Sequence, residues 1–252
     1  MEKIIARQLI KKTDTSEIMG YELLVQSDAE SLYNSSVDSA AANAMTAFLT
    51  ENSSKIFRDR KTFMTFTPAL LFRNTPKIFD KDMIVIQIED NVVIHPLASI
   101  LIEKYREEGY HFAINDFQFI PKYFSMLEYV DYIKVKVTGE EEDRERRSLE
   151  NVVEMAHGFG KEVIATSINT KEAFLLAKEI HTDYVEGAYI SDTSVSKVGK
   201  MEYLQGNLYQ LIMEVTKDEP DMEVMEQIET RDAALTYALL KMANSAYFSA
   251  KD

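Results

Sequence analysis

Residues 131–167 read DYIKVKVTGEEEDRERRSLENVVEMAHGFGKEVIATS, and this stretch decides the fold class. It begins with a short alternating apolar run (131–137), continues through a segment typical of a helix (142–160) and ends in a second short apolar run (162–167). Gly158 and Gly160 stand where the C-terminus of a helix commonly has a glycine. Two short strands joined by a helix form a βαβ unit, whose strands lie in a parallel sheet. The stretch therefore predicts a parallel α/β fold.

The same alternation continues on both sides of this unit. Ahead of it, residues 3–11 and 17–26 alternate around the polar segment TDTSE and predict a β-hairpin. Residues 38–51 predict a helix with Asp38 as N-cap. Seven or eight strands in about 200 residues favour a TIM-like (β/α) barrel with an N-terminal hairpin, and a doubly wound sheet is the alternative. The remaining predicted strands are 62–67, 83–88, 111–116 and 182–187, and the remaining predicted helices are 96–109 and 169–180.

The strand pattern stops after residue 205. The segments NLYQLIMEV (207–215), MEVMEQIET (222–230) and AALTYALLKMANSAYF (233–248) are all helical in type, and Pro220 marks a break between helices. The sequence therefore predicts a barrel domain over residues 1–200 and a small all-helical segment over residues 206–252.

Composition limits the classes of function. The formal net charge of −14 argues against general nucleic-acid binding by the surface. The absence of cysteine excludes disulfides and thiolate metal sites, and it favours a cytoplasmic protein. The sequence contains no run of 18 apolar residues and no signal-peptide pattern, so we expect no membrane segment.

Polar residues cluster at the C-terminal ends of the predicted strands. In a parallel barrel these ends meet on one face, where function collects. Helix capping explains one such residue, but a ring of them predicts a polar pocket. The ring consists of Glu22, Thr65, Gln87, Asn115, Asp116, Lys134, Lys136, Thr166, Asn169 and Glu186.

Seven short stretches, in chain order, carry a resemblance to a known family. They are YELLVQ (21–26), FMTFTPALL (63–71), VIQIED (85–90), AINDFQ (113–118), DYIKVK (131–136), VIATSINT (163–170) and DYVEGAYIS (183–191). They resemble the motifs of the EAL-type cyclic-di-GMP phosphodiesterase domain, at the spacing of that family, over about residues 1–195. The resemblance implies a TIM-like barrel, and it implies that active members use Mg²⁺ or Mn²⁺.

The resemblance also implies that most metal ligands of the family are replaced in this chain. Glu22 and Asp116 match two ligands, and Lys134 matches the lysine that lies near the nucleophilic water. The other positions depart from the family: Thr65 replaces Asn, Gln87 replaces Glu, Asn115 replaces Asp, Lys136 replaces Asp, Thr166 and Asn169 replace two Glu, and Glu186 replaces Gln.

These replacements predict that the metals, and phosphodiesterase activity with them, are lost. A lysine about 4 Å from a bound cation costs roughly 4 kcal/mol per unit of charge at an effective dielectric constant near 20. We expect the ammonium of Lys136 to replace the metal beside Glu22 and Asp116, with a solvent-facing Lys136 as the alternative. Catalytic residues and a metal cofactor are therefore not expected.

The C-terminal stretch IETRDAALTYALLKMANSAYF (228–248) resembles the first helices of an HDOD domain. Its apolar residues Leu235, Leu239, Leu240 and Tyr247 need a surface on which to pack. The leading hypothesis is therefore a catalytically inactive bacterial signalling module that acts through a protein partner or a second copy.

Two alternatives remain. A cyclic-di-GMP receptor that does not hydrolyse its ligand is disfavoured, because Gln26 or Val25 stands where the family motif has a phosphate-binding arginine. A weak phosphodiesterase would have to work with Glu22, Asp116 and Lys134 alone.

Overall fold

The computed structural model describes residues 3–26, 60–72, 74–118, 120–191 and 194–198, followed by the shorter stretches 207, 210–211, 214–215, 217, 219–232 and 235–236. The helix predicted over residues 38–51 lies outside the described residues.

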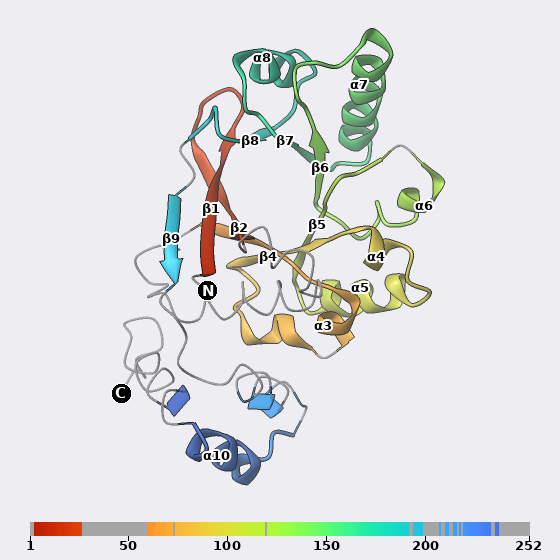
Figure 1. Ribbon diagram of the computed structural model, residues 1–252. Coiled ribbons are helices and arrows are strands. Elements are labelled where there is room, and N and C mark those ends of the chain that lie inside the picture. The colour runs from red at the N-terminus through yellow and green to blue at the C-terminus, as the bar shows by residue number, and fades with distance from the viewer. Residues whose placement is uncertain are drawn as a thin grey trace.

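A closed barrel of eight strands forms the centre of the molecule (Figure 1). Neighbouring strands from β2 to β8 pair in parallel, and β1 closes the barrel by pairing antiparallel with both β2 and β8. The predicted TIM-like barrel with an N-terminal hairpin is therefore confirmed. The strands are β1 (Lys3–Lys12), β2 (Ile18–Gln26), β3 (Lys61–Thr65), β4 (Ile84–Ile88), β5 (His111–Ile114), β6 (Tyr132–Lys136), β7 (Glu162–Thr166), β8 (Tyr184–Glu186) and β9 (Ser194–Val198).

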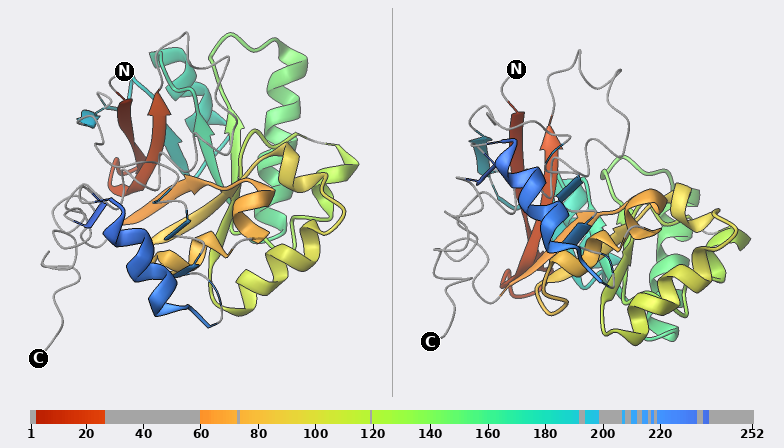
Figure 2. Two further views of the ribbon diagram at one scale, coloured as in Figure 1. Left: turned by 60° about the horizontal axis from the view of Figure 1, so that its bottom comes forward. Right: turned by 90° about the horizontal axis from the view of Figure 1, so that it is seen from below.

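Helices lie outside the strands, as the left view of Figure 2 shows for the green α7 and the yellow α5. The three long helices follow the predictions closely: α5 (Ala98–Glu107), α7 (Asp143–Gly158) and α8 (Lys171–Glu179). Helix α7 begins with a capping box between Glu142 and Glu145, and the Thr170 side chain caps α8 by accepting from the backbone N–H of Ala173. Local sequence thus fixes where α7 and α8 begin.

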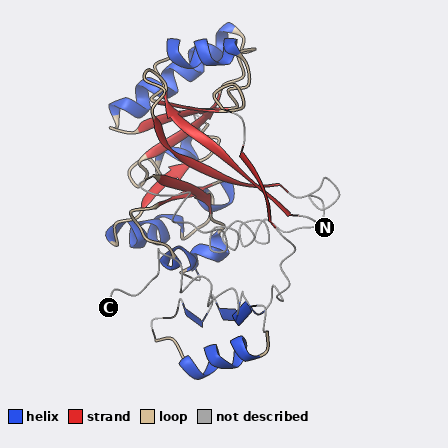
Figure 3. Ribbon diagram, turned by 90° about the vertical axis from the view of Figure 1, so that its left-hand side faces the viewer, coloured by secondary structure: helices blue, strands red, loops and turns tan. Residues whose placement is uncertain are grey.

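Four short elements and one strand were not predicted. They are α3 (Pro68–Phe72), η1 (Thr75–Ile78), α4 (Asp90–Val93), α6 (Pro121–Phe124) and β9. Each short helix spans about one turn, which is too brief to show a periodic pattern. Strand β9 pairs with residues 3–7 of β1, beyond the part of β1 that contacts β8. The paired β1 and β2 consequently extend away from the other strands toward the N-terminus (Figure 3).

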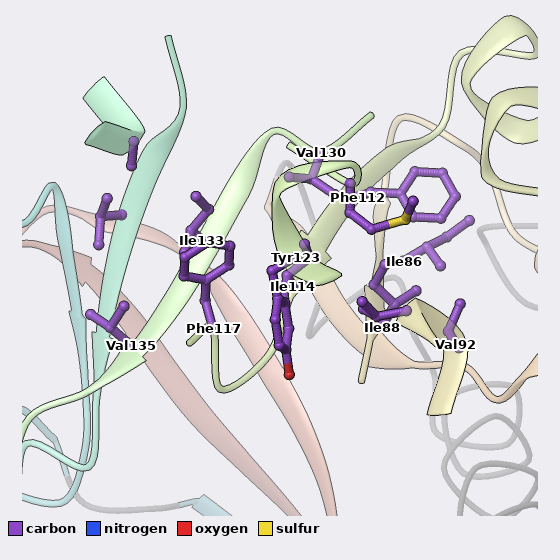
Figure 4. Close-up of a cluster of buried hydrophobic side chains, with 14 of the residues drawn as sticks. Ile86, Ile88, Val92, Phe112, Ile114, Phe117, Tyr123, Val130, Ile133 and Val135 are labelled. Atoms are coloured by element: carbon purple, nitrogen blue, oxygen red, sulfur yellow. The ribbon is translucent and has the colours of Figure 1, made fainter. Parts of the chain in front are cut away.

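The period of two along each strand separates two apolar regions. Alternate residues of β4, β5 and β6 face outward and pack under the helices, as Figure 4 shows for Ile86, Phe112 and Ile133. The intervening residues point into the barrel, where they form an inner apolar layer. That layer consists of Ile10, Phe63, Val85, Ala113, Tyr132, Ile164 and Tyr184. Residues two positions further along these strands, including Lys134 and Glu186, therefore also point inward.

Asp131, immediately before β6, connects three groups. Its carboxylate lies 2.5 Å from Arg106 Nη1, accepts a hydrogen bond of 3.0 Å from the backbone N–H of Phe112, and lies 3.2 Å from His111 Nδ1. Burial raises the pKa of Asp131, but the Phe112 N–H and the Arg106 guanidinium outweigh it and leave the pKa below its ordinary value.

A depressed carboxyl pKa makes the contribution of Asp131 to stability depend on pH. That contribution is fully present above the unfolded-state pKa of about 3.9, and it is lost as the pH falls through the lower folded-state pKa. Asp131→Asn is therefore expected to lower the free energy of unfolding by about 1–2 kcal/mol at pH 7, and by progressively less below pH 4. Urea unfolding at several pH values measures this. The exposed Asp82, changed to Asn, is the control, and a pH-independent loss for Asp131→Asn would contradict the prediction.

The described C-terminal residues are helical, as predicted. Helix α10 (Met222–Thr230) begins directly after the predicted break at Pro220, and the Asp221 side chain caps it by accepting from the N–H groups of Glu223 and Val224. Leu235 is buried. Leu239, Leu240 and Tyr247 lie outside the described residues, and the division of the chain at residues 200 and 206 stays a prediction. No helix in the described part of the chain is long and apolar enough to span a membrane.

Candidate functional site

Five of the predicted site residues meet inside the barrel, near the C-terminal ends of their strands. They come from five different strands, so the closed sheet brings together residues that lie far apart in the sequence. We call this group the Lys134 network. It consists of Glu22 (β2), Thr65 (β3), Gln87 (β4), Lys134 (β6) and Glu186 (β8).

Lys134 is the centre of this network, and its side chain is only 1% exposed. Its Nζ lies 2.9 Å from Glu22 Oε2 and 2.9 Å from Glu186 Oε2, and it donates a hydrogen bond of 3.0 Å to Gln87 Oε1. The Phe63 ring lies beneath the ammonium, with its centroid 5.7 Å from Nζ. An ammonium group has three N–H donors, and three oxygens surround this one.

Gln87 connects Lys134 to the other side of Glu22. Its Nε2 donates to Glu22 Oε1 at 2.7 Å and to Thr65 Oγ1 at 2.9 Å, while its Oε1 accepts from Lys134. The opposite orientation of the amide would place its N–H₂ group against the ammonium, so the contacts fix the orientation. Both carboxylate oxygens of Glu22 are consequently engaged, one by Gln87 and one by Lys134.

Two carboxyl groups share one ammonium inside the barrel, and their pKa values shift in opposite directions. Burial raises the pKa of Glu22, but the charge of Lys134 and hydrogen bonds from neighbouring side chains lower it to about 2. Burial also raises the pKa of Glu186, and the charge of Glu22 adds to this effect. Lys134 offsets them only in part, so the pKa of Glu186 stays well above its ordinary value. Glu22 and Lys134 are the two groups that contact the Glu186 carboxyl, with Lys134 Nζ 2.9 Å from Glu186 Oε2.

Comparison with known protein families assigns the barrel. The sequence profile of the EAL domain matches residues 51–193, which is more than half of the chain. The chain belongs to the EAL domain family. The profile of the HDOD domain matches residues 203–252, in agreement with the resemblance seen in the helical tail.

Individual relatives of this EAL protein are distant. It is 25% identical over 257 aligned positions to YuxH of Bacillus subtilis, covering 98% of this chain and 61% of that one. It is 22% identical over 244 positions to the cyclic di-GMP phosphodiesterase CdgJ of Vibrio cholerae, covering 96% of this chain and 56% of that one. The chain thus spans less than two thirds of the length of either relative.

A solved structure supports the EAL fold. BlrP1 of Klebsiella pneumoniae, determined as a calcium and cyclic-di-GMP complex, is similar over 78% of this chain and 57% of that chain. The TM-score is 0.65 and the sequence identity is 15%. At that identity the similarity shows the fold alone.

Lys136 does not lie where we expected it in this EAL barrel. It is exposed at the end of β6, so the expectation that its ammonium sits between buried acids is wrong. Lys134 holds that position instead. Lys136 pairs with Thr166, the last residue of β7, whereas Lys134 pairs with Ile164 of the inner apolar layer. The register therefore places Lys134 one step deeper in the barrel.

Other positions that match EAL motifs lie around the mouth of the barrel. Asp116 is exposed in the loop after β5, with a left-handed φ of 47°, and it is not one of the groups around Lys134 Nζ. The Thr166 hydroxyl donates to the backbone oxygen of Val135, and the exposed Asn169 accepts from the N–H of Ala188. The Thr166 contact joins β7 to β6, and the Asn169 contact joins the loops that follow β7 and β8.

Glu89 is a site residue that the sequence prediction missed. It is half-buried directly after β4. Burial raises its pKa, a hydrogen bond with Asn115 lowers it, and the charges of Asp116 and Glu22 raise it again, so that the pKa lies above its ordinary value. Its position immediately after the strand MIVIQI is the same signal that selected the other residues. Within the described residues, no three His, Asp or Glu side chains come together in a way that could hold a metal ion.

Proposed function

We propose that this chain is an EAL-family signalling module that does not hydrolyse cyclic-di-GMP and acts by contact with another protein. One observation carries the proposal: Gln87 and Thr65 stand where the family has metal ligands, and Gln87 turns the N–H₂ group of its side chain toward Glu22 Oε1 at 2.7 Å and Thr65 Oγ1 at 2.9 Å.

The residues present do not fit a pair of divalent cations. Hard cations such as Mg²⁺ need several carboxylates. Here Glu22 has both oxygens engaged, and Gln87 turns an N–H₂ group toward it. Without metal-activated water, the residues of the network offer no route to phosphodiester cleavage.

Exposed apolar side chains support contact with another protein. Phe72 of α3 is 46% exposed, and Ile94, Leu97 and Ile100, around the start of α5, are 60%, 47% and 65% exposed. The Phe72 ring packs edge-on against His95, which follows Ile94 in the chain, with the ring centroids 5.1 Å apart. Exposed apolar groups that adjoin each other are typical of protein-binding surfaces.

The exposed Lys136 favours a second candidate function, a receptor that binds cyclic-di-GMP without cleaving it. It stands at the C-terminal end of β6, where the ammonium can meet a phosphate from solvent. The acidic groups Glu89 and Asp116 near the same mouth oppose an anionic ligand, so we place this function second.

A hydrolysis assay tests the proposal. The purified chain, incubated with cyclic-di-GMP and either Mg²⁺ or Mn²⁺, is expected to give no turnover above the enzyme-free rate. CdgJ of Vibrio cholerae serves as the positive control. Turnover that Glu22→Ala abolishes would overturn the proposal.

Isothermal titration with cyclic-di-GMP separates the two candidates. We expect no heat of binding at micromolar concentrations. Micromolar binding that Lys136→Ala weakens, with no turnover, would instead establish the receptor.

A further inference from the structure

We infer that the protein partner presents an acidic segment, which docks on Arg106 and Lys161 at the amino-terminal face of the barrel. This inference rests on the proposed function and deepens it, because it states the chemistry of the partner and the surface that receives it. Both residues lie at the end of the barrel opposite the Lys134 network, since they come just before strands β5 and β7 begin.

Backbone hydrogen bonds place four residues, which we call the basic cluster, side by side. The N–H of Asp131 donates to the backbone oxygen of Phe112 at 2.9 Å, and the backbone oxygen of Asp131 accepts from the N–H of Glu162 at 3.0 Å. Asp131 is thereby fixed between β5 and β7. The N–H of Lys161 donates to the backbone oxygen of Ala156 at 2.8 Å, so the end of α7 holds Lys161 in place. The basic cluster consists of Arg106 (α5), His111 (β5), Asp131 (before β6) and Lys161 (before β7).

The basic cluster carries more positive than negative charge. Asp131 Oδ2 lies 2.5 Å from Arg106 Nη1 and 3.2 Å from His111 Nδ1. Lys161 has no such partner: in the part of the chain that the structure describes, its Nζ makes neither a hydrogen bond nor an ion pair. One carboxylate therefore faces the charges of Arg106 and Lys161 together, and one positive charge is left over even when His111 is neutral.

The position of Lys161 disfavours its own charge. Lys161 is half-buried, and burial lowers its pKa. The charges of Asp131 and Glu128 raise the pKa, the charge of Arg106 lowers it again, and the result lies below the ordinary value for lysine. A partly buried cation that the fold does not stabilise is typical of a residue kept for binding, where a ligand supplies the missing negative charge.

A carboxylate supplies what the basic cluster lacks. The surplus is one positive charge, which one carboxylate balances and a phosphate dianion would exceed. The Arg106 side chain is 32% exposed, so solvent reaches it. Its guanidinium contacts Asp131 through Nη1, and among the described residues its other N–H donors have no partner. Arg106 can thus hold a second carboxylate together with Lys161.

An exposed aromatic residue stands close to Lys161 in the chain. Phe159 is 60% exposed, and Gly160, between Phe159 and Lys161, has a left-handed φ of 69°. Both side chains therefore belong to one tight turn at the end of α7. Aromatic and arginine side chains often dominate the binding energy of protein interfaces. We accordingly expect the acidic segment to carry an apolar residue as well.

Fluorescence anisotropy tests this inference with a fluorescein-labelled peptide of glutamates around one leucine, titrated with the full chain at low salt. A peptide with glutamine in place of glutamate is the neutral counterpart and is expected not to bind. Lys161→Met is expected to weaken binding of the acidic peptide at least about 10-fold, because a hydrogen bond between charged groups is lost. Lys171→Met is the matched control, since it removes an exposed lysine from α8, and it is expected to bind as the wild type does.

Urea unfolding separates a binding role of Lys161 from a structural one. Lys161→Met is expected to unfold at the same urea concentration as the wild type or at a higher one, because the Lys161 ammonium has no partner to lose among the described residues. A variant that is both less stable and weaker in binding would overturn the inference, since Lys161 would then support the fold.

The remaining outcomes concern other occupants of this surface. No binding of the acidic peptide, or equal affinity for Lys161→Met and the wild type, would overturn the inference. Inorganic phosphate that binds through Lys161 more tightly than the peptide would overturn it in favour of a small anion, and a dimer that Lys161→Met dissociates would do so in favour of a second copy. Turnover of cyclic-di-GMP together with Lys161-dependent peptide binding would defeat only the proposed function. Equal peptide affinities without turnover would defeat only this inference.

Discussion

Lys134→Met is expected to lower the free energy of unfolding at neutral pH, in the absence of divalent cations, by about 3–5 kcal/mol. Methionine fills a similar volume, so little of the loss comes from packing. The loss arises because Glu22 and Glu186 stay buried without their cation, and Gln87 Oε1 loses its donor. Urea unfolding followed by circular dichroism measures the change.

Two further variants make this test specific. Lys136→Met alters the exposed lysine of the same strand and is expected to change stability by no more than about 0.5 kcal/mol. The triple variant with Lys134→Met, Glu22→Gln and Glu186→Gln replaces the ionic groups by neutral ones and is expected to recover most of the loss. Equal effects of the two lysine changes would refute the view that Lys134 is the internal cation.

Gly187→Ala is the second change expected to have a large effect. A Cβ at this position would lie 2.2 Å from the backbone oxygen of Ile168 and 2.5 Å from both its carbonyl carbon and its nitrogen. These atoms cannot move aside, because Ile168 is held by backbone hydrogen bonds to Glu186 and Tyr189. We expect a loss of about 3 kcal/mol or more, together with displacement of Glu186 from Lys134.

Gly158→Ala is the matched control for Gly187→Ala. A Cβ at Gly158, in the last turn of α7, would meet no atom within 4 Å. Its expected effect lies between neutral and a gain of about 1 kcal/mol, because alanine favours the helix. Thermal unfolding of both variants gives the comparison. A Gly187→Ala protein that melts with the wild type would show that the loop after β8 can rearrange.

The barrel was predictable because its strands and long helices are long enough to show their periods. The run 162–167 and the strand β7 (Glu162–Thr166) agree to within one residue, and the helix α7 fills most of the segment predicted for it. Strand β9 was missed because it forms by pairing with residues 3–7 of β1, and pairing between segments distant in the chain leaves no local sequence pattern. The one-turn helices were missed because a single turn is too short to show a periodic pattern.

The sequence predicted which residues form the candidate site, but not how they are arranged in space. The alternation in DYIKVKV places Lys134 and Lys136 on the same face of β6, and sequence cannot tell which of the two lies deeper. Depth is set by the register, which aligns Lys134 with Ile164 of β7. The pairing of Lys134 with Glu186 was equally hidden, because it joins strands that β7 separates. Glu89, in contrast, could have been found by the same strand-end rule.

The position of β1 in the sheet also determines when the barrel can close during synthesis of the chain. It is the first of the barrel strands to leave the ribosome, yet one of its neighbours is β8, and Lys11 Nζ donates to the backbone oxygen of Ile190, 179 residues later. Until β8 has been synthesised, the sheet of the nascent chain cannot close. Glu22 is synthesised well before both Lys134 and Glu186, so the Lys134 network cannot form earlier either. Contacts between such distant segments slow folding and expose apolar strands to aggregation. The barrel therefore completes its centre only after all eight of its strands have been translated, and we expect that interval to be the stage at which folding depends most on chaperones.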